Sequence, residues 1–173
     1  MTSASRLRSF RPLALFAVIA AAFSLSGCGV NNIPTYEESA KAAWAEVQNQ
    51  YKRRTDLIPN LVESVKGFAE QERKVLTDVT EARAKATSVQ IPADILTNPE
   101  AMKQYQDAQN TLGGALRQLL AVVERYPDIK SGQNFLALQS QIEGTENRIS
   151  IARRDYIQAV RQYNTEIATF PGR

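Results

Sequence analysis

The sequence is 173 residues long, enough for one domain with a hydrophobic core, and carries 21 basic and 18 acidic residues. The only charges before residue 28 are Arg6, Arg8 and Arg11, so the rest of the chain has 18 basic residues against 18 acidic ones and lacks the basic excess that nucleic-acid binding requires. The sequence contains no histidine, which excludes His-ligated metals and His-dependent catalytic triads, and we predict no metal, cofactor or small-molecule substrate.

The first predicted element is a secretion signal. After the three arginines comes an apolar run from Leu13 to Leu25, which at 13 residues is shorter than the roughly 20 that a transmembrane helix needs. The next residues resemble the lipobox of bacterial lipoproteins, in which the signal is cut before a cysteine that then carries a lipid: Leu25, Ser26, Gly27 and Cys28. We therefore predict a signal peptide over 1–27 and palmitate-type acylation of Cys28. The alternative is an ordinary secretory signal with an incidental cysteine.

A lipid on Cys28 predicts where the mature chain lies. It would tether the protein to a membrane of the bacterial envelope, facing the periplasm or the exterior, and firmly, because each buried CH₂ contributes about 0.8 kcal/mol. Gly29 follows the cysteine, where an aspartate would retain the protein on the inner membrane of enteric bacteria. This favours the outer membrane where two membranes exist. Residues 28–34 show no hydrophobic period and predict a short tether.

The mature chain reads as helical almost throughout. From Tyr36 the apolar residues follow the three-and-four spacing of a helix with one buried face, and this first helix is predicted to end near Arg54. Pro59 fits the first turn of a helix, so a second helix is predicted to begin at Thr55 or Asp56 and to reach about residue 87. The apolar phase continues across Pro59, however, so a single long helix kinked there is the alternative.

Two further helices follow a loop at residues 88–97. Asn98 caps the third, with Pro99 in its first turn, and Pro127 ends it. The fourth carries large apolar residues at seven-residue intervals: Phe135, Ile142, Ile149, Tyr156, Tyr163 and Phe170. Long helices joined by short loops predict an all-α fold, an antiparallel four-helix bundle over 35–171, against the alternative three-helix arrangement with a first helix kinked at Pro59.

Several segments together resemble the LemA family. Residues 52–62, with the sequence KRRTDLIPNLV, followed by Val65, Lys66 and Gly67, are similar to the family signature. Later segments agree in order: Glu124–Pro127, Thr145–Ile149, Ala152–Tyr156, then Tyr163 with Asn164, and finally Phe170 with Pro171. The resemblance covers about residues 31–171 and implies a helical bundle outside the cytoplasmic membrane, with no established enzymatic activity. Members commonly keep an uncleaved anchor helix instead of a lipobox. Members also usually continue past the Phe-Pro pair with an apolar and aromatic tail. This sequence has Gly172 and Arg173 there instead, so the resemblance implies no role of such a tail for it.

Two groups of polar residues are candidate sites. If the turns at 56–60 and 126–131 meet at one end of the bundle, they form an exposed tip that could dock a partner: Arg53, Arg54, Asp56, Asn60, Tyr126 and Asp128. The alternative, which we favour, is that the charged members only cap and pair helix ends. A second group flanks the seam of the fourth helix and predicts an interhelical polar network: Asn147, Arg148, Arg154 and Asp155. Gly113 and Gly114, in mid-helix, predict a close helix approach or a hinge.

From the residues and the resemblance together we expect a non-enzymatic adaptor or scaffold for other envelope proteins, held to the membrane by the lipid on Cys28. The alternative is an envelope enzyme such as a carboxylate-dependent glycan hydrolase. That activity requires two acids about 5 to 9 Å apart in a cleft.

Overall fold

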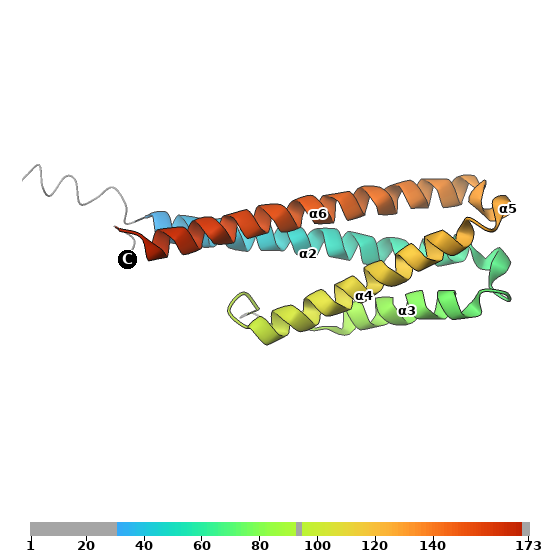
Figure 1. Ribbon diagram of the computed structural model, residues 1–173, viewed down its shortest axis with the longest axis horizontal. Helices are drawn as coiled ribbons and strands as arrows, with labels where there is room; N and C mark the ends of the chain where they lie inside the picture. The colour runs from blue at the N-terminus through green and yellow to red at the C-terminus, as the bar shows by residue number, and fades with distance from the viewer. Residues whose placement is uncertain (1–30, 93–94, 171–173) are drawn as a thin grey trace, which may run out of the picture. The chain divides into compact units, whose positions relative to one another are not determined.

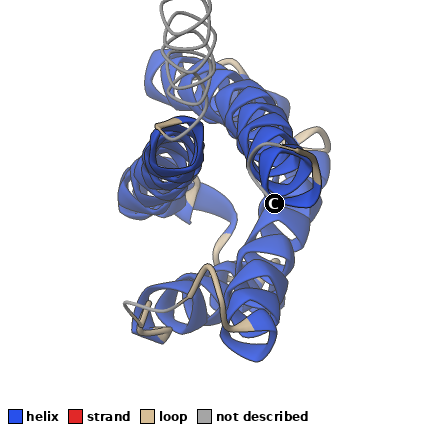
Figure 2. Ribbon diagram, turned by 90° about the vertical axis from the view of Figure 1, so that its left-hand side faces the viewer, coloured by secondary structure: helices blue, strands red, loops and turns tan. Residues whose placement is uncertain are grey.

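The computed structural model describes residues 31–92 and 95–170, and helices make up most of them (Figure 1). The described residues form four long helices and two single turns: α2 (Asn32–Ser64), η1 (Lys66–Phe68), α3 (Arg73–Ser88), α4 (Pro99–Val123), α5 (Pro127–Lys130) and α6 (Gln133–Ala168). The part of the chain described contains helix and loop but no strand, so the predicted all-α class is confirmed (Figure 2). The predicted signal peptide, its cleavage region and Cys28 lie outside the described residues.

The chain divides into two compact units. Unit 1 takes in the described residues up to Ala43 and those from Asp155 onward, and unit 2 is Trp44–Arg154. Helices α2 and α6 each contribute residues to both units. In the ranges that the structure describes, no helix combines the length and the hydrophobicity that a membrane span needs.

The hydrophobic core of unit 2 is built from one face of each long helix. Helices α3 and α4 pack side by side (Figure 1). Along α2, α3 and α4 the core residues recur every three or four positions, which is the spacing of a single buried stripe. The core is formed by Ile58, Leu61, Val65, Phe68, Val75, Val79, Ala82, Ala86, Leu112, Leu116, Leu119, Val123, Phe135 and Ile142.

The seven-residue repeat of α6 is buried only in its first half. Phe135, Ile142 and Ile149 are at most 4% exposed, as the repeat predicts. Tyr156 and Tyr163 are half-buried. The large residues of the repeat are therefore less completely buried in the second half of the helix, where Ala159 is still buried.

The predicted helix boundary near Pro59 is wrong. Helix α2 runs through Pro59 to Ser64, and the chain turns only over residues 65–72, so neither a new helix at Thr55 nor a continuous helix to residue 87 is found. Proline lacks an N–H, which leaves the carbonyl four residues earlier without its helical donor. That carbonyl belongs to Thr55, and Nε of Arg83 in α3 donates to it at 3.2 Å. A side chain from another helix thus replaces the hydrogen bond that the proline removes.

The start of α2 also differs from the prediction. The helix begins at Asn32, so residues 32–34 of the predicted tether are helical. Pro34 lies in the first turn, where backbone N–H groups have no helical partner and a proline is tolerated.

We expect Pro59→Ala to raise the free energy of unfolding by about 1–2 kcal/mol, since the helical cost of proline exceeds the entropy that it removes from the unfolded chain. Arg83→Gln should lower that free energy by about 1 kcal/mol, because Thr55 loses its donor. Arg83→Gln should cost less in the Pro59→Ala background, where the restored N–H serves the carbonyl. Urea unfolding of the four proteins measures this coupling, with Lys85→Gln, an exposed change on α3, as the control. Equal effects of Arg83→Gln in both backgrounds would contradict the compensation.

Candidate functional site

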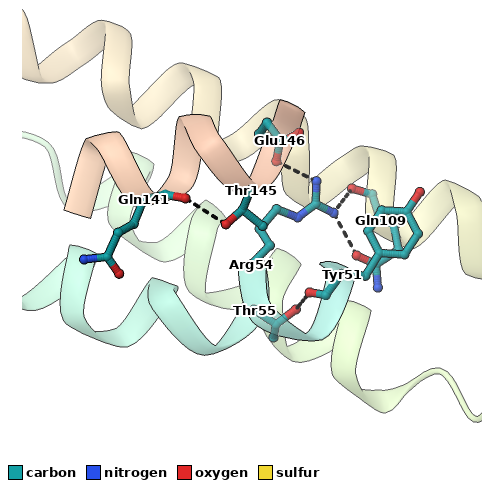
Figure 3. Close-up of polar contacts among 7 residues, drawn as sticks. All are labelled: Tyr51, Arg54, Thr55, Gln109, Gln141, Thr145 and Glu146. Carbon is teal, nitrogen blue, oxygen red and sulfur yellow. Dashed lines mark hydrogen bonds and ion pairs between the residues drawn. The ribbon is translucent and has the colours of Figure 1, made fainter. Parts of the chain in front are cut away.

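A buried group of polar side chains surrounds Arg54 of α2 (Figure 3). Arg54 is 3% exposed. Its Nη1 donates to Oε1 of Glu146 in α6 at 2.8 Å. Its Nη2 donates to two oxygens of Gln109 in α4, the backbone carbonyl at 2.8 Å and Oε1 at 2.7 Å. One guanidinium therefore connects three helices, and we call Arg54, Gln109 and Glu146 the Arg54 cluster.

An aromatic ring and two hydroxyl groups lie next to the guanidinium of Arg54. The Cζ of Arg54 lies 5.2 Å from the centroid of the Tyr51 ring, within the range of a cation–π contact. The neighbouring hydroxyls bond within their own helices, Thr55 to the carbonyl of Tyr51 at 2.9 Å and Thr145 to that of Gln141 at 2.7 Å (Figure 3). Glu146, whose side chain is 39% exposed, is the member of the cluster that water can reach. The cluster thus joins helices, with one edge open to solvent.

The sequence did carry a signal for this cluster. Arg54 interrupts the apolar stripe of α2 between Tyr51 and Ile58, and Gln109 interrupts that of α4 between Tyr105 and Leu112. A polar residue at the buried phase of two helices indicates a pair that crosses the core. The sequence pattern instead predicts that role for four other residues, all in or next to the seam of α6.

The structure places the predicted network of α6 at the surface, and its role between helices stays a prediction. All four of its residues are exposed: Asn147, Arg148, Arg154 and Asp155. They flank the buried stripe without entering it, because the seam positions between them are held by residues such as Ile149 and Ala152. Glu146, one position before the predicted group, does bond across to another helix, through Arg54 of α2.

Gly113 makes room for the Arg54 cluster. A Cβ at Gly113 would lie 3.3 Å from Nη1 of Arg54, closer than nearly all real Cβ contacts, whereas a Cβ at Gly114 would meet nothing within 4 Å. The close approach predicted for the glycine pair therefore holds for Gly113, and the approaching group is a side chain.

The two glycines give a matched test. We expect Gly114→Ala to raise the free energy of unfolding by about 0.5–1 kcal/mol, because alanine is the better helix former. Gly113→Ala should lower it, since the shift forced on Arg54 disturbs three hydrogen bonds at once. Urea unfolding of both variants measures the two changes in the free energy of unfolding. An equal gain in both would show that the guanidinium adjusts without loss.

Three aromatic residues pack next to the cluster. Tyr105 lies edge-on to both Trp44 and Tyr51, with ring centroids 5.7 Å apart in each pair. Burial, and secondarily the neighbouring Tyr51, raises the pKa of Tyr105 to about 12. Burial also raises the pKa of Tyr51. Both phenols therefore stay protonated in the folded protein at pH values where exposed tyrosines ionise.

The raised pKa of Tyr105 predicts a loss of stability in alkali. The unfolded chain releases this proton near pH 10 and the folded protein holds it to about pH 12, so the contribution is complete below pH 10 and lost between these values. We expect a loss of about 2–3 kcal/mol over that window. Urea unfolding at a series of pH values measures it, and Tyr105→Phe should flatten the dependence. An unchanged slope in the variant would refute the assignment.

A second contact joins two turns of unit 2. Phe68 of η1 stacks on Tyr126, with ring centroids 4.8 Å apart. Oε1 of Glu72 accepts from Nη2 of Arg125 at 2.6 Å and from the hydroxyl of Tyr126 at 3.2 Å. Gly67 lets this approach occur, because a Cβ there would lie 3.3 Å from Cδ1 of Ile129. We call residues 65–72 and 124–131 together the paired turns.

The predicted docking tip is corrected by these positions. A turn does meet residues 126–131, but it is formed by residues 65–72 and not by 56–60, since α2 continues through Pro59. Arg54 is buried, so it is not on an exposed tip. Tyr126 is half-buried, and the remaining members are exposed: Arg53, Asp56, Asn60 and Asp128. Their role in docking stays a prediction.

The described pockets are open surface grooves. One of about 370 Å³ follows α3 and has two carboxylates in its lining, Glu70 and Glu81, together with Arg73. Another of about 370 Å³ is lined by Asn60 and residues of α6 including Asn134. Within the ranges that the structure describes, no group of three or more His, Cys, Asp or Glu side chains is placed to hold a metal ion.

Comparison with known proteins identifies a matching family and several relatives. The sequence model of the LemA family matches residues 43–173. The chain is similar to magnetosome protein MamQ 2 of Paramagnetospirillum magneticum, with 26% identity over 157 residues that cover 82% of this chain and 58% of the relative. It is also similar to protein LemA of Metamycoplasma hominis, with 25% identity over 140 residues that cover 81% and 60%. The chain thus spans about three fifths of the length of these curated relatives.

Proposed function

The chain belongs to the LemA family, and from this premise we propose that it is an envelope lipoprotein, anchored through Cys28, that acts as a non-enzymatic adaptor or scaffold for other envelope proteins. The observation that carries the anchoring is the order of Leu25, Ser26, Gly27 and Cys28 directly after a short apolar run. LemA is not a known enzyme family, which supports the non-enzymatic part of the proposal.

The use of buried polar groups supports a scaffold. A catalytic site needs polar groups that converge on a cleft. In the Arg54 cluster, Nη1 and Nη2 of the guanidinium bond across helices to Glu146 and Gln109. The cluster thus stabilises a rigid support, and recognition falls to exposed residues at its turns and faces.

Lipidation is tested in bacteria fed an alkyne analogue of palmitate. The wild-type protein should take up the label, and its intact mass should correspond to a chain that begins at residue 28 and carries acyl groups. Cys28→Ala should abolish both. A matched variant that combines Cys28→Ala with Ser140→Cys keeps one thiol, on an exposed position of α6, and should remain unlabelled. An uncleaved, unacylated wild-type chain would refute the anchoring.

Docking is tested by photo-crosslinking in cells. A photo-reactive residue is placed at Asn60 or at Asp128, exposed positions at the end of α2 and in α5, and at Lys85, an exposed control on α3. We expect the first two positions to give crosslinks to envelope proteins that Lys85 does not give. Identical products from all three would count against docking near the paired turns.

A further inference from the structure

Unit 1 exposes apolar side chains at the C-terminal end of α6. Ile167 is 40% exposed and Phe170, two residues past the helix, is 93% exposed. Single exposed apolar residues are normal on protein surfaces. Here an aliphatic and an aromatic side chain, three residues apart, are exposed at one end of a helix, so the end itself is apolar.

This end lies beside the beginning of α2. Nδ2 of Asn32 donates to Oε1 of Glu166 at 3.1 Å, and Figure 1 shows the first turn of α2 next to the last turns of α6. Asn32 is four residues from Cys28, a length of chain that reaches at most about 14 Å when fully extended. A lipid on Cys28 would therefore hold the end of α6 close to the bilayer surface.

The charge of unit 1 decides what kind of membrane contact is favoured. Residues 31–43 and 155–170 contain two basic residues, Lys41 and Arg161, against four acidic ones, Glu37, Glu38, Asp155 and Glu166. These described residues carry a net negative charge, which anionic headgroups do not attract. A contact through Ile167 and Phe170 would come from the burial of apolar side chains, which does not depend on headgroup charge.

We propose that Ile167 and Phe170 form a second contact with the lipid bilayer by entering the boundary between headgroups and acyl chains. The inference rests on the membrane anchoring proposed above. The contact orients the end of unit 1 on the membrane, where the lipid alone would leave it free to turn about the tether. It persists at high salt and on uncharged membranes.

A fluorescent probe next to Phe170 tests this contact. In the acylated protein the thiol of Cys28 is blocked, so Thr169→Cys, at an exposed position, supplies one reactive thiol for an environment-sensitive dye. The full-length lipoprotein is incorporated into phosphatidylcholine vesicles, with or without phosphatidylglycerol. We expect the dye to brighten severalfold, to be quenched by spin-labelled lipid and to be shielded from iodide, equally in both vesicles. Ser140→Cys, 29 residues earlier and also exposed, is the matched control. A dye at this position should not brighten, should not be quenched by spin-labelled lipid and should be quenched by iodide.

The outcomes separate this inference from the proposed anchoring. When Ile167→Ser and Phe170→Ser are added to Thr169→Cys, the dye should be dim and accessible to iodide, while the protein still floats with the vesicles. A dye that is water-exposed on a floating, acylated protein overturns the second contact and leaves the anchoring intact. A signal seen only with phosphatidylglycerol overturns it too. A chain whose mass shows no lipid and which does not float overturns both.

Discussion

Arg54→Ala is expected to lower the free energy of unfolding by about 2–4 kcal/mol, because buried partners lose a charged donor at once. Oε1 of Gln109, in a residue that is 3% exposed, would be left without the guanidinium. Glu146 would lose its ion pair but is 39% exposed, so water can replace part of that interaction. The measurement is urea unfolding followed by circular dichroism.

The neighbouring arginine is the matched control. Arg53→Ala removes the same type of side chain from an exposed position of the same helix and should change the free energy by less than about 0.5 kcal/mol. Arg54→Lys should fall between the two, since an ammonium group cannot reproduce the planar fork of donors. Glu146→Gln should cost less than Arg54→Ala. Equal effects of the two arginine truncations would show that the Arg54 cluster adds nothing to stability.

Phe68→Ala should lower the free energy of unfolding by about 3–5 kcal/mol, the range for truncating a large core aromatic residue. Phe68 is fully buried, belongs to the core of unit 2 and stacks on Tyr126. Its loss removes the apolar support of the paired turns. Thermal and urea unfolding measure the change.

Phe170→Ala controls for the loss of a phenyl ring as such. Phe170 is 93% exposed, so in the absence of membranes its truncation should leave stability unchanged to within about 0.5 kcal/mol. Tyr126→Leu separates the ring contact from core burial and should cost less than Phe68→Ala. A loss below about 1 kcal/mol for Phe68→Ala would mean that the turn rearranges to fill the space.

Local rules predicted the parts of the fold that depend on neighbouring residues. Asn98 was predicted to cap α4 and does so, since its Oδ1 accepts from the N–H of Ala101 at 3.1 Å. The buried phase of α6 was predicted from its repeat and holds through Ile149. In both cases the residues that determine the structure are on the same helix, so the local sequence is enough to predict it.

The wrong predictions concern positions whose structure depends on residues far away in the sequence. A proline normally begins or breaks a helix. At Pro59 the freed carbonyl of Thr55 is bonded to Arg83, 28 residues away in sequence, which no local pattern reveals. The partners of Arg54 lie 55 and 92 residues away, so an arginine in a run of charged residues looked like a surface residue. The sequence shows that Arg54 interrupts the apolar stripe of α2, but it does not show which residues of other helices Arg54 bonds to.

The chemistry of the Arg54 cluster also bears on how the protein responds to acid. Arginine keeps its proton at every pH that a cell encounters, and the amide group of Gln109 does not titrate. Two of the three cross-helix bonds join the guanidinium of Arg54 to carbonyl oxygens of Gln109, in contrast to histidine-based contacts that break near neutral pH. The link between α2 and α4 at Arg54 therefore works without histidine, the side chain whose charge changes near neutral pH, and the sequence contains no histidine that could loosen it.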